Sequence, residues 1–236
     1  MMGVSVCSWP PSLLPRSPPS LKRFGVYSSS SPQSLCPTRE TTLSIIHNSG
    51  VIACLRANSA ELAFEAASAA LRGGISVLEI VMSTPGVFQV LQQLVQDHPT
   101  VALGVGTLLN VEDAMKAKSA GAKFLMSPAM VMILSAYDAG SKIVKVYPVS
   151  ALGGIHFISA LKKPFPHISV LASQGIMIDS VRDYISCGAS SVVLSDAIFN
   201  KEAMAQKNFN AIYQLASLAA LQGKEAVLRK RNYNPN

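Results

Sequence analysis

The feature that most constrains the fold of this chain is a regular alternation of short apolar segments and helical patterns. The apolar segments are rich in β-branched residues and recur at intervals of about two dozen residues. They begin at Val51, Ser76, Val101, Lys123, Lys142, Ser169 and Ser191. Alternation of strands and helices predicts parallel βαβ units with right-handed crossovers.

We therefore expect an α/β fold, a TIM-type (β/α)8 barrel with about seven recognisable strands. Hydrophobic residues make up 49% of the chain and aromatic ones only 6%, which indicates an aliphatic core between a sheet and its helices. A doubly wound sheet is the alternative, but Arg56-Ala57-Asn58 follows the first strand in place of a GxGxxG turn. One strand and one helix of a complete barrel are missing between Pro128 and Ile133, so we expect an incomplete or distorted wall there.

Three regions are expected: a disordered transit peptide over 1–39, the barrel over 40–225 and a polar C-terminal tail over 226–236. The first region is rich in Ser and Pro, contains Arg16 and Arg23, and has no acidic residue before Glu40. This composition is typical of an organelle-targeting leader. Its prolines disfavour a long amphipathic helix, so we expect a chloroplast destination, with the mitochondrion as the alternative. A disordered tail without a targeting role is the remaining possibility.

Charge and cysteine content exclude several classes of function. The net charge is +7, but much of it lies in the leader, and no basic cluster with interleaved aromatic residues points to nucleic acid. No apolar run reaches the roughly 20 residues that would cross a membrane. Cys54 and Cys187 are isolated, and the four histidines lack HxH or HxxxH spacing, so no metal site is expected.

Lys145 is the most informative residue for chemistry, because it lies in the otherwise apolar strand Ile143–Tyr147. Burial disfavours an ammonium ion, so we expect a lowered pKa for this amine. A neutral amine can attack a ketone and form a Schiff base. A lysine that reaches solvent or pairs with a carboxylate is the alternative explanation.

Glu79 lies in a second strand that should be buried, Val77–Val81, and it needs a partner there. A barrel brings the carboxyl ends of its strands together, so Glu79 and Lys145 could meet and exchange protons. A purely structural ion pair is the alternative. The segment Gly104 to Asn110 adds glycines and the hydroxyl of Thr107 at a strand end, although a capped turn explains it equally well.

Several segments together resemble the class I KDPG/KHG (2-keto-3-deoxy-6-phosphogluconate / 2-keto-4-hydroxyglutarate) aldolase family over residues 49–222. They are Leu78-Glu79-Ile80, Gly104 to Asn110, Ser127-Pro128, and Val144 to Pro148 with Gly153-Gly154. The resemblance implies a homotrimeric barrel and a lyase of carbohydrate metabolism. It would cleave or form a C–C bond in a small 2-keto acid, with pyruvate as product and no metal or cofactor.

The resemblance also assigns roles to single residues. Lys145 corresponds to the Schiff-base lysine and Glu79 to the general acid/base. Thr107 corresponds to a threonine that contacts the pyruvyl group, and Pro128 and Tyr147 to positions in the pocket wall. Ser173 and Gly175 could donate hydrogen bonds to the far end of a substrate.

Two residues depart from the family pattern. Ser83 stands where the family has an arginine that binds the substrate carboxylate, and a serine lacks the charged bidentate fork. Asp196 stands in the phosphate-binding stretch, where its charge disfavours a phosphorylated substrate. A catalytically silent barrel that serves as a binding or scaffold protein, and a 2-keto acid decarboxylase, are therefore the alternative functions.

Overall fold

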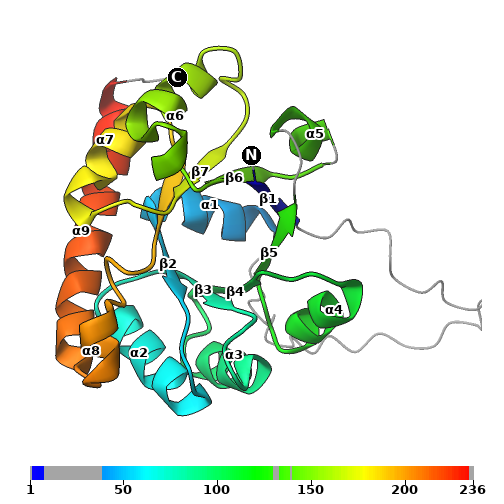
Figure 1. The fold of residues 1–236 in the computed structure, drawn as a ribbon, viewed down its shortest axis with the longest axis vertical. Coiled ribbons are helices and arrows are strands. Elements are labelled where there is room, and N and C mark those ends of the chain that lie inside the picture. Colours follow the sequence, from blue (N-terminus) through cyan, green and yellow to red (C-terminus); the bar gives the residue numbers. More distant parts are fainter. Residues whose placement is uncertain (1, 8–38, 130–132, 139, 234–236) are drawn as a thin grey trace, which may run out of the picture.

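The computed structural model describes residues 2–7, 39–129, 133–138 and 140–233, and within them the strands form a closed barrel (Figure 1). The order around the barrel is β1-β5-β4-β3-β2-β8-β7-β6. Seven of these strands run parallel, which confirms the predicted TIM-type α/β fold. They are β2 (Val51–Leu55), β3 (Val77–Val81), β4 (Ala102–Gly106), β5 (Phe124–Ala129), β6 (Ile143–Tyr147), β7 (Val170–Ser173) and β8 (Ser191–Leu194).

Helices form the outer layer and begin where the sequence supplies caps. The side chains of Ser59, Asn110 and Asn200 each accept a backbone N–H of the helix that follows, which satisfies a donor that has no partner inside the helix. The helices after β2 are α2 (Ala60–Arg72), α3 (Val87–Asp97), α4 (Val111–Ser119), α5 (Ile133–Asp138), α6 (Gly154–Lys162), α7 (Val181–Ser186), α8 (Lys201–Ala205) and α9 (Phe209–Tyr233). Short 3₁₀ turns, η1 (Ser150–Leu152) and η2 (Ile178–Ser180), precede α6 and α7.

The barrel has a separate inner core, and one end of it is closed by α1 (Arg39–Ser49). Ser191, the first residue of β8, donates a hydrogen bond of 2.8 Å to the carbonyl of Ile46. This contact places α1 at the amino ends of the strands, so the carboxyl ends form the open rim. The buried residues of the inner core are Ile46, Ile52, Val77, Ala102, Phe124, Met126, Ile143, Leu171 and Val193.

The eighth strand is β1 (Met2–Cys7), which pairs antiparallel with β5 on one side and β6 on the other. Residues 2–7 lie within the segment 1–39 that was expected to be a disordered transit peptide, and the structure gives them as a strand of the sheet. Residues 8–38 of the expected leader lie outside the described residues. The wall that the absent βα unit was expected to open is closed by this strand.

The C-terminal region also differs from the expectation of a polar tail over 226–236. Helix α9 continues to Tyr233, and Ala226 and Val227 are buried on it. Lys230 donates a hydrogen bond of 3.0 Å from Nζ to the carbonyl of Ala189. The sequence pattern did not predict this continuation of α9, because the buried face of its last turns consists of only a few residues among charged neighbours. Residues 234–236 lie outside the described part.

No helix in the described residues is both long enough and apolar enough to cross a membrane.

Candidate active site

Lys145 and Glu79 meet in the middle of the barrel. Lys145 lies on β6 and Glu79 on β3, and these strands are opposite one another in the closed order. The amine Nζ lies 3.0 Å from Oε2 of Glu79 and 3.4 Å from Oε1. Both side chains are buried, with 7% of Lys145 and 2% of Glu79 exposed, so the predicted meeting of amine and carboxylate is present in the structure.

The alternation of each strand turns these two side chains inward. Leu78 and Ile80 belong to the core between sheet and helices, as do Val144 and Val146, so the residues between them face the barrel interior. An inward carboxylate would leave an inward amine as its best partner, since an unpaired charge is costly in such a place.

Gly106, the last residue of β4, leaves room for the carboxylate. A Cβ on Gly106 would overlap Oε1 of Glu79 and lie 2.6 Å from its Cδ. There is therefore a steric reason for a glycine at position 106, which the sequence alone did not reveal.

The electrostatic environment corrects one expectation about Lys145. Burial lowers the pKa of this amine, but the charge of Glu79, the nearby Cys54 and the hydrogen bond to Glu79 together raise it above its ordinary value of 10.5. The predicted lowering is wrong because it considered burial without the partner that the opposite strand supplies. In this state the amine is protonated at neutral pH, and it must lose a proton before it can act as a nucleophile.

Two sulfur atoms lie near the pair. Met126 Sδ is 3.5 Å from Nζ of Lys145. Burial and the charge of Glu79 raise the pKa of Cys54 to about 12, so this thiol stays protonated. Cys54 is therefore a polar neighbour of the carboxylate and not a second nucleophile.

The other residues expected in the site lie at the open rim, at or just beyond the carboxyl ends of four strands. Thr107 follows β4, is exposed and has a positive φ of 62°. Tyr147 ends β6 and is 37% exposed, and Ser173 ends β7 and is buried. Gly175 has a φ of 73°. Pro128 is the fifth residue of β5, and its side chain is not described.

The two departures from the family pattern also lie at this rim, and both Ser83 and Asp196 are exposed.

Arg56 is a functional candidate that sequence reasoning missed. It follows directly after β2, is exposed, and is close enough to Cys54 to affect its pKa. We compared the three residues that follow each of the seven parallel strands in the sequence. Among them, only Arg56 is basic. Counting positive charges at strand ends would have found it.

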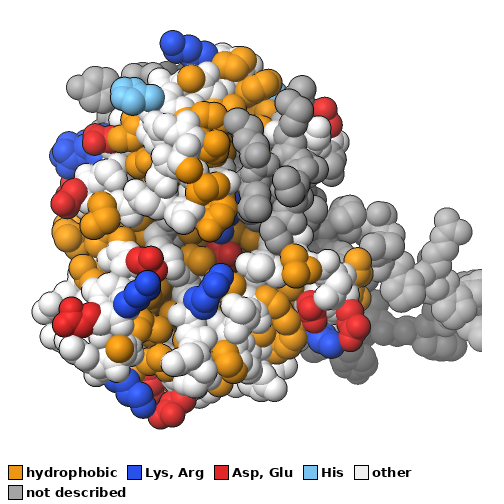
Figure 2. Space-filling model, viewed as in Figure 1, with side chains coloured by type: hydrophobic (Ala, Val, Ile, Leu, Met, Phe, Trp, Pro, Cys, Tyr) orange, Lys and Arg blue, Asp and Glu red, His pale blue; other side chains and the backbone are white. Residues whose placement is uncertain are grey.

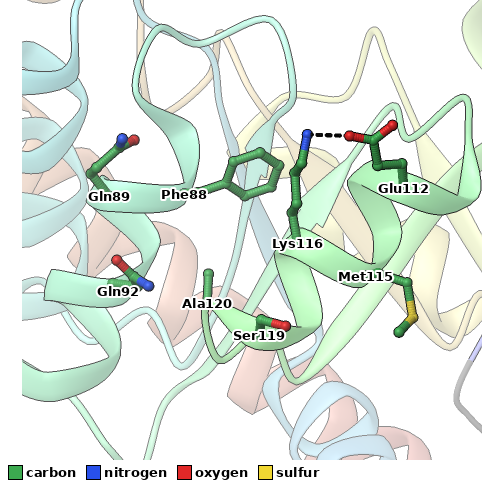
Figure 3. Close-up of a pocket in the computed structure, with 8 residues that line it drawn as sticks. All are labelled: Phe88, Gln89, Gln92, Glu112, Met115, Lys116, Ser119 and Ala120. Atoms are coloured by element: carbon green, nitrogen blue, oxygen red, sulfur yellow. Dashed lines mark ion pairs between the residues drawn. The ribbon is translucent and has the colours of Figure 1, made fainter.

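A groove of about 440 Å³ lies elsewhere, between α3 and α4 on the outside of the barrel (Figure 3). Lys116 and Glu112 form an exposed ion pair of 2.7 Å at its edge. The groove contains none of the residues around Lys145. Its lining is Phe88, Gln89, Gln92, Glu112, Met115, Lys116, Ser119 and Ala120.

Among the described residues, no group of three or more His, Cys, Asp or Glu side chains is arranged to hold a metal ion. The chemistry that the residues of the site themselves offer is that of an amine and a carboxylate in contact.

A closed barrel of seven parallel strands and one antiparallel strand, with a lysine–carboxylate pair inside its open end, defines the class as a TIM-type enzyme barrel. The family model described as KDPG and KHG aldolase matches residues 43–135 and 129–215, and the chain belongs to this family. The two matched segments meet where the sequence lacks a βα unit and where β1 enters the wall. Aldolases are carbon–carbon lyases, and this chain is an aldolase-type lyase.

Individual relatives agree with this assignment. The chain is 28% identical over 176 residues to 2-dehydro-3-deoxy-phosphogluconate aldolase of Treponema pallidum, covering 63% of this chain and 84% of that protein. It is 25% identical over 183 residues to KHG/KDPG aldolase of Escherichia coli, covering 66% and 86%.

Solved structures show the same fold. KDPG aldolase from Legionella pneumophila, captured with pyruvate as a covalent carbinolamine intermediate, superimposes with a TM-score of 0.67 at 24% identity. This comparison covers 75% of this chain and 96% of that one. KDPG aldolase of Zymomonas mobilis with 3-phosphoglycerate gives a TM-score of 0.66 at 20% identity, covering 78% and 96%.

Proposed function

We propose that this chain is a class I aldolase in which Lys145 forms a Schiff base with a 2-keto acid and Glu79 carries the protons. The observation that supports this most directly is the 3.0 Å contact between Nζ of Lys145 and Oε2 of Glu79 inside the barrel. An isolated buried lysine would have no means to lose its proton and regain it, whereas the carboxylate provides both.

Imine formation begins when Glu79 accepts a proton from the ammonium of Lys145. The free amine attacks the keto carbon, so a C–N bond forms and the carbonyl oxygen becomes a hydroxyl in a carbinolamine. Glu79 then returns its proton to this hydroxyl, which leaves as water, and a protonated imine remains. The raised pKa of Lys145 makes this exchange with Glu79 an obligatory first step.

Cleavage uses the protonated imine as an electron sink. The hydroxyl on C4 of the substrate gives its proton to Glu79 and C4 becomes the carbonyl carbon of an aldehyde as the C3–C4 bond breaks, while the electron pair of that bond converts the protonated imine into an enamine. Glu79 then gives this proton to C3 of the enamine, and addition of water to the protonated imine that results releases pyruvate and the amine of Lys145. The reverse order forms the bond, so the same residues serve both directions.

We propose an unphosphorylated 2-keto acid as substrate, held by its carboxylate near Arg56. Ser83 lacks the charge that the family arginine supplies, and Arg56 is the basic residue at the rim that can replace it. Asp196 follows β8, the strand next to β2, and its charge disfavours a phosphate at that part of the rim. Thr107, Pro128 and Tyr147 would bound the pyruvyl end, and Ser173 and Gly175 the far end.

Reduction with borohydride in the presence of millimolar pyruvate tests the imine. The wild-type chain should gain a covalent adduct at Lys145, and Lys145→Ala should lose it. Lys142→Ala is the matched control, since Lys142 is exposed and three residues away on the same segment. Absence of an adduct in the folded wild-type chain, together with a melting shift caused by pyruvate, would instead support a binding protein. Carbon dioxide in place of an aldehyde among the products would support a decarboxylase.

We also propose a homotrimer and a chloroplast location. The trimer is supported by the family resemblance and by the exposed apolar side chains of Leu109, Val111 and Met115 around the start of α4, where hydrophobic residues gather in Figure 2. Light scattering of the purified chain tests the assembly, and a monomer would contradict it. The location is supported by the composition of the leader, and a fluorescent fusion in plant cells tests it.

A further inference from the structure

The barrel contains one strand that runs opposite to the other seven. β1 lies between β5 and β6, with Ser5 opposite Ser127 on one side and opposite Val144 on the other. β5 and β6 follow one another along the chain, and the sequence lacks a βα unit between them. The N-terminal strand therefore occupies the slot that a further parallel strand would fill.

The sequence of β1 fits this slot. Large apolar residues alternate with small ones, as a strand with one inner and one outer face requires. The register pairs Val4 with Lys145 and Val6 with Ile143, which are inner positions of β6. In the sequence, Met2, Val4 and Val6 alternate with Gly3, Ser5 and Cys7, and the register pairs Met2 with Tyr147.

The slot lies directly beside the lysine. β6 is paired with β7 along one edge and with β1 along the other. Without β1, the edge of β6 next to Lys145 would be unpaired and the wall between β5 and β6 would be open. Water would then reach the ion pair and weaken it, since the attraction of two charges falls as the surrounding dielectric rises.

We propose that Met2–Cys7 is the eighth strand of the active-site wall and holds β6 in the position that the imine chemistry of Lys145 requires, a role that rests on the function proposed above. A peptidase that removes the leader would then open the barrel beside the lysine. Processing of the N-terminus and activity are coupled in this protein.

A disulfide tests the placement of β1 without any substrate. Opposed residues of antiparallel strands have Cα atoms about 4.5–5.5 Å apart, within the range that a disulfide can span. In the full chain with Cys7→Ser and Cys36→Ser, Ser5→Cys with Ser127→Cys should cross-link under mild oxidation. Ser5→Cys with Ser83→Cys should not, since β3 lies three strands away from β1. Equal yields from the two pairs, or no 5–127 bond, would overturn the placement.

Cleavage after folding tests the effect on Lys145. A specific protease site replaces 28–31 in the cross-linked chain, which is folded, oxidised and then cut. The locked chain should trap pyruvate at the rate of the uncut chain. Reduction and removal of the released peptide should slow trapping at least tenfold and speed amide exchange in β5 and β6, while β2 and β8 stay protected. An unchanged rate, or exchange that rises equally in all strands, would refute the positioning role.

The two tests also separate this proposal from the function on which it rests. If the wild-type chain traps no pyruvate, the imine function fails, while the 5–127 cross-link and the local exchange still report on the strand. If the wild-type chain traps pyruvate and release of the strand does not change the trapping rate, only the proposal about β1 fails.

Discussion

Gly106 on β4 and Glu79 on β3 are so close that any β-carbon on the glycine would overlap the carboxylate of the glutamate. The two residues are on neighbouring strands, and Gly106 pairs in register with Val81, two residues after Glu79. The carboxylate therefore occupies the space that a side chain at 106 would fill. Its position in front of Lys145 depends on the absence of that side chain.

Replacement of this glycine should reduce activity more than stability. In Gly106→Ala, the added methyl group should displace the carboxylate from the amine and slow imine trapping about 100-fold, since a displacement of about 1 Å can have such an effect. Gly104→Ala is the control on the same strand, because its Cβ would instead meet the ring of Phe124 at 2.6 Å. The control should lose about 1–3 kcal/mol of unfolding free energy through overpacking. Equal trapping rates in the two variants would contradict this role of Gly106.

The ion pair should serve chemistry more than stability. Lys145→Met leaves Glu79 buried without its partner and should lower the free energy of unfolding by about 3–5 kcal/mol. The double variant Lys145→Met with Glu79→Leu removes both charges and should recover most of this loss, while remaining unable to form an imine. Urea unfolding of the three proteins measures the effect, and a double variant no more stable than the single one would disagree.

Stability should depend on pH through Lys145. Its pKa in the folded chain lies above the ordinary value of 10.5, because Glu79 outweighs the effect of burial. A raised folded pKa stabilises the protein fully below the unfolded value and loses this contribution as the pH rises through the folded value. Unfolding free energies measured from pH 8 to beyond 10.5 should therefore fall more steeply for the wild type than for Lys145→Met. Parallel curves would show that the two pKa values are the same.

Arg56 should govern the apparent affinity for the keto acid. Arg56→Ala should raise the pyruvate concentration for half-maximal trapping about tenfold, since a hydrogen bond to a charged group contributes about 1.5–3 kcal/mol. The maximal trapping rate should change little, because Arg56 touches neither Lys145 nor Glu79 in this scheme. Arg72→Ala, an exposed arginine at the end of α2, is the control. An unchanged half-maximal concentration would show that Arg56 does not bind the carboxylate of the keto acid.

The last turns of α9 should be part of the folded barrel. Val227 is buried and its neighbour Leu228 is 58% exposed, so the pair provides a matched test. Val227→Asp should lower the unfolding free energy by about 2–4 kcal/mol, since it buries a charge that has no partner. Leu228→Asp should change it by no more than about 0.5 kcal/mol. Thermal or urea unfolding distinguishes them, and two equally mild effects would indicate the polar tail that the sequence suggests.

Local patterns along the sequence determined the class of the fold and the two residues at its centre. Apolar β-branched strands and capped helices are properties of a few consecutive residues, so seven parallel strands could be predicted from them. Lys145 and Glu79 were conspicuous for the same reason, because a charge in an apolar strand is visible without knowing its partner.

Tertiary structure decided what depends on residues far apart in the chain. The sequence shows that Lys145 is buried, but only the closed barrel brings β3 opposite β6, and the charge supplied from there reverses the direction of the pKa shift. The steric role of Gly106 depends likewise on a carboxylate from the neighbouring strand. Residues 2–7 show the limit most clearly, since the pattern of a short leader strand cannot reveal that β5 and β6 leave a slot open for it. Pairing partners are set by backbone hydrogen bonds between distant segments, and those exist only once the barrel has formed.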